Sequence, residues 1–455
     1  MVVHEIKQDL AISVPKQRSE KMKNSTRDIV IFWFRRDLRL EDNTGLNAAL
    51  RSKVPVLPVF IFDDSILNTL PPDDARLDFI YRQLNKIHGY LKGQGSGLYC
   101  RRGSVIQIWE ALLQEFQVKA VYCNKDYEPE AIRRDDSVKD LLEKRGIKFY
   151  CFKDQVIFEE DEIVKSDGMP YTVFTPYMHK WRETLKAQGI PETGTEKGRF
   201  YHYESKFPEA SELHFHSGPE TVKPYDLKHI GRYAAERDYP AKEAGSYLGP
   251  HLRFGTLSVR ELISQLDPVK HTVFLSELIW REFFMQILYH YPRVATESFR
   301  EKYMGIQWRN DQKEFESWCR GQTGYAMVDA GMRQLNESGY MHNRVRMVAA
   351  SFLCKHLLVD WRWGEAYFAS KLLDYELSSN NGNWQWAAGT GCDAAPYFRI
   401  FNPVSQQQKF DKDFAYISKW IPGFRANQYI PFIVDHAYAR ERALKTYRHG
   451  TREEN

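Results

Sequence analysis

Residues 374–403 gather side chains that could hold a flat, polar ligand. Carboxylates and amides precede two indole rings there: Asp374, Glu376, Asn380, Asn381, Trp384 and Trp386. Gly382, Gly389 and Gly391 lack side chains and would let the backbone approach another group closely. The stretch is therefore either a ligand pocket between indoles and hydrogen-bonding groups, or a polar loop capped by aromatic residues of the core.

A second group of such side chains lies on a strongly apolar, predicted helix. Glu277, Trp280 and Arg281 are spaced i, i+3 and i+4, so they project from one helix face. Asn343 and Met347 share a face of a later helix in the same way. The plain interpretation is a core Trp with an ion pair and a packing Met. The functional one is an aromatic wall with polar groups for a ligand.

The motifs of common hydrolytic centres are missing. The sequence has no HExxH, no GxSxG, no P-loop and no Cys/His cluster with metal-ligand spacing, so no metal site is predicted. Its six Cys form no CxxC pair, which predicts reduced thiols in a cytoplasmic protein. No apolar run approaches the roughly 20 residues of a membrane helix, so no membrane partner is predicted.

Length and composition indicate the elements that must position these groups. A chain of 455 residues is too long for one core and predicts two or three domains. Eight of its 11 Trp lie at or after Trp280, which favours a C-terminal half that holds a conjugated ligand. The net charge of +4 permits a polyanionic partner without requiring one.

The N-terminal part predicts an open, parallel, Rossmann-like α/β sheet. Five short runs alternate with amphipathic stretches: Ile29–Phe34, Val54–Phe62, Gly97–Arg101, Lys119–Cys123 and Lys148–Phe152. From about residue 228 the periodicity is helical. We therefore expect a disordered extension (1–27), an α/β domain (28–152), a long linker (153–227) and a helical domain (228–455).

The segment 374–403 closely resembles the flavin-contacting signature of the photolyase/cryptochrome family, in particular of class I photolyases for cyclobutane pyrimidine dimers. The resemblance runs from about Asp28 almost to the C-terminus. It implies an antenna α/β domain and a helical FAD domain, in a monomer that acts on UV-damaged DNA. The implied activity is that of a deoxyribodipyrimidine photo-lyase. Excited, reduced and anionic FAD would donate an electron to a flipped-out dimer, and photolyases are a standard example of base flipping.

The resemblance assigns residues around the flavin. Cofactor contacts are implied for Tyr233, Ser246, Leu248, Glu277, Arg281, Asn343, Arg346, Asp374, Glu376 and Asn380. Asn380 matches the position that faces flavin N5, where a neutral amide would stabilise the reduced anion. The family's phosphate loop has two hydroxyl residues where this chain has Gly245 and Gly249, so we expect backbone N–H groups to hold the diphosphate.

Further residues are assigned to the lesion, to an electron relay and to DNA. The dimer would contact Glu277, Trp280, Asn343, Met347 and Trp386, and its radical anion would be stabilised by Glu277 and Asn343. The relay, from the flavin outward, matches Trp384, Trp361 and Trp308. The DNA backbone contacts of the family match Arg237, Arg344, Arg399 and Lys409.

The sequence does not decide between two types of antenna pigment. Asp126 and Glu128 match the antenna-contacting loop of the family. Glu128 resembles the methenyltetrahydrofolate type, and Asp126 resembles the 8-hydroxy-deazaflavin type. Solvated loop acids are the plain interpretation of both residues.

Two other functions within the family stay open. A cryptochrome-type light receptor is disfavoured because Asn380 is neutral and because only a short tail follows residues 433–447, which resemble a terminal photolyase helix. A (6-4) photolyase is disfavoured because that type has histidines where this chain has Asn343 and Met347.

Overall fold

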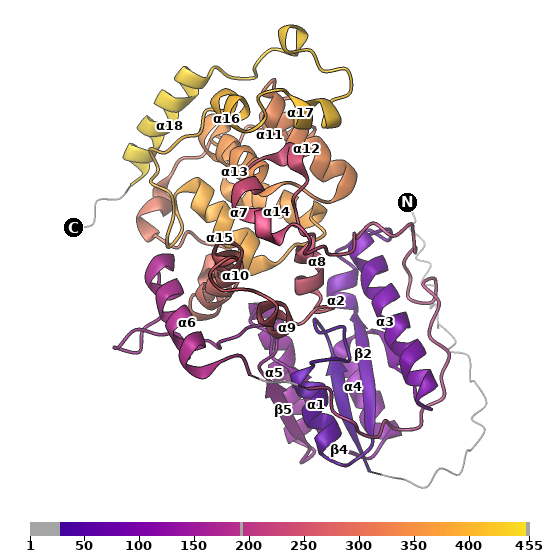
Figure 1. Ribbon diagram of the computed structural model, residues 1–455. Coiled ribbons are helices and arrows are strands. Elements are labelled where there is room, and N and C mark those ends of the chain that lie inside the picture. Colours follow the sequence, from indigo (N-terminus) through magenta and orange to yellow (C-terminus); the bar gives the residue numbers. More distant parts are fainter. Residues whose placement is uncertain (1–27, 192–193, 452–455) are drawn as a thin grey trace, which may run out of the picture.

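The computed structural model describes residues 28–191 and 194–451, and the predicted extension 1–27 lies outside them. An α/β domain and a helical domain lie side by side in the described part (Figure 1). The predicted combination of a parallel sheet with a helical domain is confirmed. Within the described ranges, no helix is long and apolar enough to cross a membrane. No group of three His, Cys, Asp or Glu side chains in those ranges is arranged to hold a metal ion.

The α/β domain is built on five parallel strands in the order β3-β2-β1-β4-β5. Their bounds lie close to the predicted runs: β1 Ile29–Phe34, β2 Val56–Asp63, β3 Tyr99–Gly103, β4 Val118–Asn124 and β5 Lys148–Phe152. The strand order changes direction between β1 and β4. The carboxyl ends of these two strands therefore form the switch point at which such sheets bind ligands.

Helices cover both faces of the sheet, so every residue of β1 is buried. Val30, Phe32 and Phe34 pack with helices on one face, and Ile29, Ile31 and Trp33 pack with helices on the other. The first face is covered by α1 (Thr44–Arg51) and α3 (Ala75–Gly93), and the second by α4 (Val105–Glu115) and α5 (Pro129–Glu143). A short helix, α2 (Asp64–Leu67), follows β2.

The predicted linker is packed along most of its described length. It forms α6 (Phe174–Gln188), which lies against α10 of the helical domain. Its later part runs along the α/β domain beside α3 (Figure 1). Phe207, Leu213 and Phe215 are buried there in the same core as α3. This stretch therefore completes the α/β core in addition to joining the domains.

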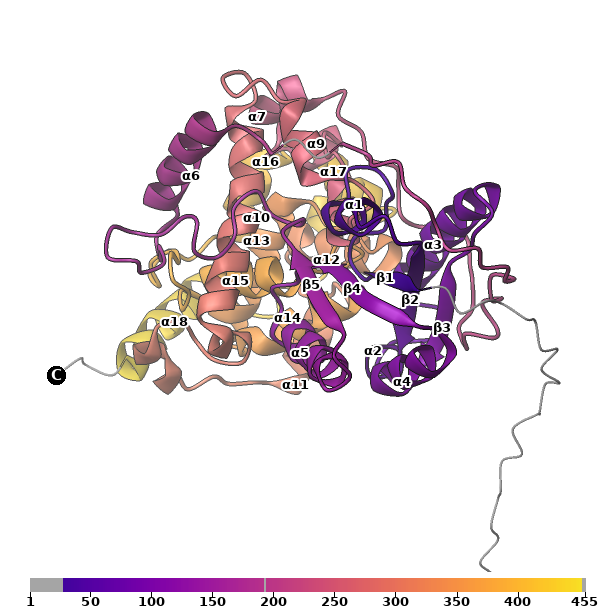
Figure 2. The same cartoon turned by 90° about the horizontal axis from the view of Figure 1, so that it is seen from below.

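The helical domain surrounds α10 and α15, which lie next to each other in both views (Figure 2). Its helices are α7 Tyr233–Glu236, α8 Leu248–Arg253, α9 Val259–Ser264, α10 Thr272–His290, α11 Gln312–Cys319, α12 Ala326–Ser338, α13 Asn343–Ser351, α14 Trp361–Lys371, α15 Leu377–Ala388, α16 Pro403–Phe410, α17 Ala415–Trp420 and α18 His436–Gly450.

Helix α15 occupies the stretch that the sequence alone left as a possible polar loop. Gly382 lies inside this helix, and a Cβ atom there would lie 2.2 Å from the ring of Phe284 on α10. The glycine therefore allows two helices to pack closely, and the backbone at this position approaches Phe284 instead of a ligand. Gly389, with φ of 87°, ends the helix in the left-handed conformation.

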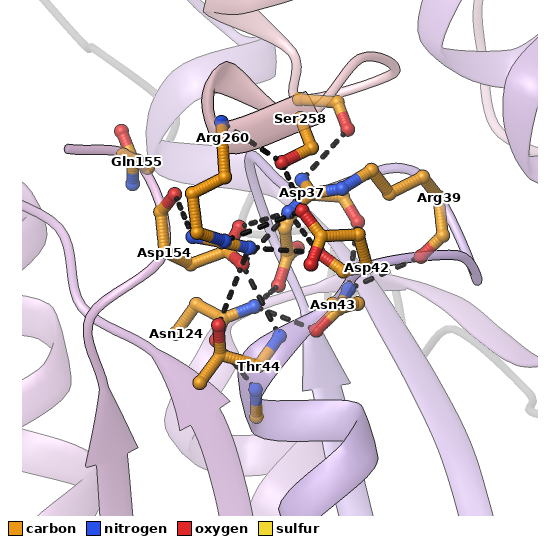
Figure 3. Close-up of polar contacts among 12 residues, drawn as sticks. Asp37, Arg39, Asp42, Asn43, Thr44, Asn124, Asp154, Gln155, Ser258 and Arg260 are labelled. Carbon is orange, nitrogen blue, oxygen red and sulfur yellow. Dashed lines mark hydrogen bonds and ion pairs between the residues drawn. The ribbon is translucent and has the colours of Figure 1, made fainter. Parts of the chain in front are cut away.

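A buried polar cluster joins the two domains (Figure 3). Asp154 follows β5 and accepts hydrogen bonds of 2.7 Å from both Arg39 and Arg260. Arg260, on α9, also pairs with Asp42 at 3.2 Å. Burial opposes the ionisation of Asp154, but the two guanidinium groups hold its pKa below the ordinary value. We call these four residues the interdomain cluster.

Candidate functional site

One cavity in the helical domain brings together eight of the predicted site residues. Amides, a guanidinium, carboxylates, a thioether and two indoles line it: Asn343, Arg346, Met347, Asp374, Glu376, Asn380, Trp384 and Trp386. They come from α13, from α15 and from the turn that precedes α15. We call this cavity the indole pocket.

Arg346 and Asp374 form the charged side of the indole pocket. The Arg346 guanidinium donates to both carboxylate oxygens, at 2.9 and 3.2 Å, and its Nε donates to the Met341 carbonyl at 2.8 Å. Gly249 lies directly beside Asp374, because a Cβ atom on Gly249 would be 2.5 Å from the Asp374 Cβ. A serine at position 249 would therefore displace Asp374, which gives this departure from the family's loop a structural reason.

Asn380 is oriented by a residue that the sequence analysis missed. Its Nδ2 donates to the carbonyl of Glu365 at 3.1 Å and to the carboxylate of Glu365 at 2.8 Å. The Asn380 carbonyl oxygen is therefore the amide atom left to accept a hydrogen bond from a ligand. Burial raises the pKa of Glu365. The available sequence signal was its place four residues after Trp361, on the same helix face.

The three predicted residues of α10 lie outside the lining of the indole pocket. Arg281 donates to Glu376 at 3.2 Å and to the Gln155 carbonyl at 2.8 Å. Glu277 pairs with Arg237. The Trp280 ring stacks on Phe174 of α6, with centroids 3.6 Å apart. The sequence analysis did not pair these two rings, because Phe174 lies in the linker.

The predicted phosphate-loop residues lie just before and within α8. Tyr247 adopts the left-handed conformation with φ of 52°, and Leu248 begins the helix as a buried residue. The carbonyl of Ser246 accepts a hydrogen bond from the Asp226 N–H at 2.9 Å. Tyr233, upstream on α7, packs edge-on against Phe274 with centroids 5.1 Å apart. The loop is therefore anchored to the linker and to α10.

The predicted relay residues go from buried to partly exposed. Trp384 and Trp361 are both 2% exposed and share one hydrophobic core, and Trp308 packs against that core as a partly buried residue. Trp384 contacts Phe368 and Trp318, with centroid distances of 5.0 and 6.1 Å.

Two of the predicted DNA contacts meet over one ring. The Arg344 guanidinium and the Lys409 amine lie 4.4 and 5.1 Å from the centroid of Phe410. Arg344 also pairs with Asp238 at 2.7 Å. The structure places Arg237 beside Glu277, and Arg399 in an exposed turn before α16.

His342 was also missed, and it precedes α13. Its Nδ1 accepts a hydrogen bond from the Arg344 N–H at 3.2 Å, which caps the helix. Burial first, and then the Arg346 charge, lower the pKa of His342 to about 4. The ring is therefore neutral at physiological pH and adds no positive charge to this surface.

Asp126 and Glu128 line a larger cavity at the switch point of the sheet. Its volume is about 890 Å³, and Trp33, Arg36 and Arg253 form part of its wall. This volume is in the range of small-molecule sites, roughly 300–1,000 Å³. We call it the switch-point cavity. Ala369 and Ser370 of α14, and Tyr375 after it, complete the wall from the helical domain, which the sequence pattern of the α/β domain did not reveal.

Arg36 connects the two cavities. It pairs with Asp126 and Glu128 at 3.1 Å each, and with Glu376 of the indole pocket at 2.6 Å. Burial alone would raise the pKa of Asp126, but Arg36 and then Arg253 lower it to about 2. Asp126 and Glu128 are thus ion-paired wall residues, and the plain interpretation as solvated loop acids is wrong.

The fold and the site define a two-domain protein with a polar pocket walled by indole rings in its helical domain. The donor set of the indole pocket fits a flavin dinucleotide. The guanidinium of Arg346 suits a cofactor oxygen, amides suit the edge of an isoalloxazine ring, and indoles suit its face.

Comparison with known proteins gives the family. Residues 30–196 match DNA photolyase, and residues 274–431 match the FAD binding domain of DNA photolyase. The chain is 36% identical to the deoxyribodipyrimidine photo-lyase of Halobacterium salinarum, over 92% of this chain and 98% of that one. A class III photolyase from Agrobacterium tumefaciens has a TM-score of 0.82 at 33% identity, covering 95% of this chain and 99% of that one.

A further solved structure has a similar fold. The archaeal photolyase from Sulfolobus tokodaii, solved with two FAD molecules, has a TM-score of 0.81 at 35% identity, covering 93% of this chain and all of that one. The chain belongs to the DNA photolyase family, within the photolyase/cryptochrome fold. The predicted enzyme class, deoxyribodipyrimidine photo-lyase, and the predicted FAD cofactor are confirmed.

Proposed function

We propose that this protein repairs cyclobutane pyrimidine dimers in DNA under light, as a class I photolyase. The supporting observation is that Asn343 and Met347, the residues matched to this lesion type, line the same cavity as Asp374, Asn380 and Trp386. A class III enzyme is among the similar structures, so the assignment to class I is the most specific part of the proposal.

The chain's own residues hold the cofactor and the lesion together. When bound, reduced anionic FAD supplies one electron to the dimer under light and recovers it after the ring opens. Arg281 and Arg346 offer guanidinium donors to cofactor oxygens. Tyr233, Ser246 and Leu248 would hold the diphosphate through the backbone N–H groups of the α8 loop. Asn380, whose amide nitrogen is held by Glu365, would offer its carbonyl oxygen to the reduced flavin without supplying a proton.

The lesion is held by polar groups between apolar walls. Glu277 and Asn343 hydrogen-bond the flipped bases and stabilise the radical anion of the dimer. Trp280, Trp386 and Met347 form the walls. Phe174 stacks on Trp280 and Phe284 packs against it at 5.3 Å, so the lesion would contact the part of the indole that these two rings leave open. Glu277 must also share its carboxylate between Arg237 and the lesion.

The remaining roles follow the same assignment. Trp384, Trp361 and Trp308 carry electrons to an oxidised flavin from the surface. Arg237, Arg344, Arg399 and Lys409 contact the DNA backbone. The switch-point cavity, with Asp126 and Glu128, holds an antenna pigment of the methenyltetrahydrofolate or 8-hydroxy-deazaflavin type. The protein acts as a monomer in the cytoplasm.

Repair of defined lesions under controlled light tests this proposal. The reduced protein is mixed with DNA that contains only cyclobutane dimers, and dimers are counted after light or darkness. We expect loss of dimers in light alone. Equal loss in light and darkness contradicts the mechanism, and repair restricted to (6-4) lesions contradicts the lesion type. No repair of either lesion supports a light receptor of the cryptochrome type.

Glu277→Ala separates the lesion site from the cofactor site. Loss of this carboxylate should lower the repair yield per absorbed photon more than it lowers the FAD content. Glu261→Ala, an exposed residue on α9, is the matched control and should change neither. Loss of FAD in proportion to loss of repair would assign Glu277 to the cofactor alone.

A further inference from the structure

Cys123 and Cys151 occupy paired positions on neighbouring strands. β4 and β5 run parallel, with Cys123 in register with Cys151, and the two Sγ atoms are 3.1 Å apart. Paired strands lie about 4.8 Å apart, which is within the Cα separation that a disulfide spans. The preceding pair, Tyr122 and Tyr150, packs its rings with centroids 5.0 Å apart and thereby holds this register.

The two thiols differ in exposure and in charge environment. Cys151 is exposed on the edge strand, whereas Cys123 is fully buried. A hydrogen bond from Cys123, together with the nearby Arg35 guanidinium, lowers the pKa of the Cys151 thiol. Burial raises the pKa of Cys123. Arg35 is held in place because it pairs with Asp135 at 2.6 Å. Cys151, on the exposed edge strand, is therefore the more accessible of the two thiols, and Cys123 lies within bonding reach of it.

We propose that Cys123 and Cys151 form a thiol pair that hydroperoxides oxidise to a disulfide. The Cys151 thiolate attacks one peroxide oxygen and the O–O bond breaks, leaving a sulfenic acid on Cys151 and, after protonation, one water. The Cys123 sulfur then attacks the Cys151 sulfur, the S–O bond breaks, and a second water leaves with the Cys123 proton. Two thiols lose two electrons and hydrogen peroxide gains two.

The pair lies next to a wall of the switch-point cavity. The Arg35 guanidinium lies 4.7 Å from the centroid of Trp33, and both residues line that cavity. Oxidation replaces a thiol whose pKa is lowered beside Arg35 by a neutral disulfide, so it removes an ionisable group next to a wall residue. Two cysteines that only filled space in the core would not require one of them to lie on the exposed edge strand near a guanidinium. Cys151 on β5 has both features.

The test uses the full-length, FAD-bound protein and hydrogen peroxide. After brief native exposure, the sample is denatured and alkylated in one step, so that every free thiol is labelled. Four of the six Cys should carry the label, and the unalkylated protein should be about 2 Da lighter than the reduced protein until dithiothreitol reverses the change. Trypsin should release peptide 120–125 joined to peptide 149–153. Six free thiols at a peroxide dose that oxidises the denatured protein would overturn the proposal, as would a sulfinic acid on Cys151 without the joined peptides.

Variants assign the steps. Cys151→Ser should keep its five remaining thiols, because Cys123 is buried. Cys123→Ser should accumulate a sulfenic acid on Cys151 that dimedone labels. Cys319→Ser, the matched control, removes a partly exposed thiol from α11 and should still close the disulfide. A disulfide that forms in Cys151→Ser would show that another pair reacts and would overturn the assignment.

Discussion

Glu282 is a buried carboxyl at the junction of α10 and the linker. It accepts hydrogen bonds from the N–H groups of Ile157 and Phe158 at 2.7 and 3.1 Å, and from the Trp181 indole at 2.7 Å. Burial nevertheless raises the pKa of Glu282 from 4.5 to about 7. Between these values the folded state binds a proton that the unfolded state has lost. The resulting stabilisation is complete below pH 4.5 and is lost as the pH rises through 7.

Glu282→Gln should remove this pH dependence. Deprotonation of Glu282 should lower the wild-type free energy of unfolding by about 3 kcal/mol between acid and neutral pH. The variant loses one hydrogen bond at every pH, a cost of about 1 kcal/mol, because one amide oxygen cannot serve all three donors. The Tm of the variant minus that of the wild type should therefore increase from pH 5 to pH 8. A constant difference, as expected for the exposed control Glu261→Gln, would contradict the buried protonation.

Trp384→Phe tests the inner end of the proposed relay. The indole is buried against Phe368 and lines the indole pocket, so phenylalanine keeps the packing but is far harder to oxidise. Photoreduction of oxidised flavin should slow by at least an order of magnitude, whereas repair by pre-reduced enzyme stays near the wild-type rate. Transient absorption after a laser flash measures the first step.

Trp318→Phe is the matched control for that variant. Trp318 is fully buried and also contacts Trp384, but it is not matched to the relay. It should lower the Tm, because its indole donates to the Ala349 carbonyl, and should leave photoreduction unchanged. Slowed photoreduction in Trp318→Phe alone would place the relay on a different path.

At the scale of elements, the start of α13 presents Arg344 to the proposed DNA surface. If Arg344 contacts a phosphate, Arg344→Ala should reduce the slope of log Kd against log salt by about 1 and weaken binding of all DNA sequences alike. Fluorescence anisotropy at several salt concentrations measures this slope. Arg320→Ala, at the exposed residue that follows α11, is the control. An unchanged slope would restrict Arg344 to its ion pair with Asp238.

The sequence pattern was most informative for whole elements. All five strands lie within two residues of the predicted runs. β1 and β2 are buried along nearly their whole length and read as continuous apolar segments, whereas the edge strands β3 and β5 are partly exposed. Helix α15 was left as a possible loop, because Asn380, Asn381 and Gly382 disfavour a helix by themselves. Packing of Gly382 on Phe284 overrides that preference.

Local sequence patterns could not predict contacts between residues that lie on different elements. Spacing within α10 placed Glu277, Trp280 and Arg281 on one face, but their contacts are Arg237, Phe174 and Glu376, which are 40 or more residues away in sequence. Glu365 was missed for the same reason. A period of 3.6 residues identifies a helix face but carries no information about what that face meets.

At the scale of the molecule, the interdomain cluster fixes how the two domains sit together. Asp154→Asn leaves Arg39 and Arg260 close together without their shared negative charge. Breaking a buried ion pair from one side costs about 3–5 kcal/mol, so the Tm should fall by several degrees. Asp413→Asn, an exposed residue after α16, is the control and should leave the Tm unchanged. A stable Asp154→Asn would show that this carboxylate is not needed to hold the domains together, and that other contacts such as the Arg36–Glu376 ion pair suffice.

One guanidinium, that of Arg36, touches acids on the walls of both cavities. A ligand that draws Arg36 toward Asp126 weakens the contact of Arg36 with Glu376. A ligand that draws Arg36 toward Glu376 weakens its contact with Asp126. Thermodynamic reciprocity then applies: whatever factor a pigment imposes on the affinity for FAD, FAD imposes on the affinity for the pigment. A pigment that passes energy to FAD would thus also change how tightly FAD is bound, because the two binding sites are coupled through Arg36.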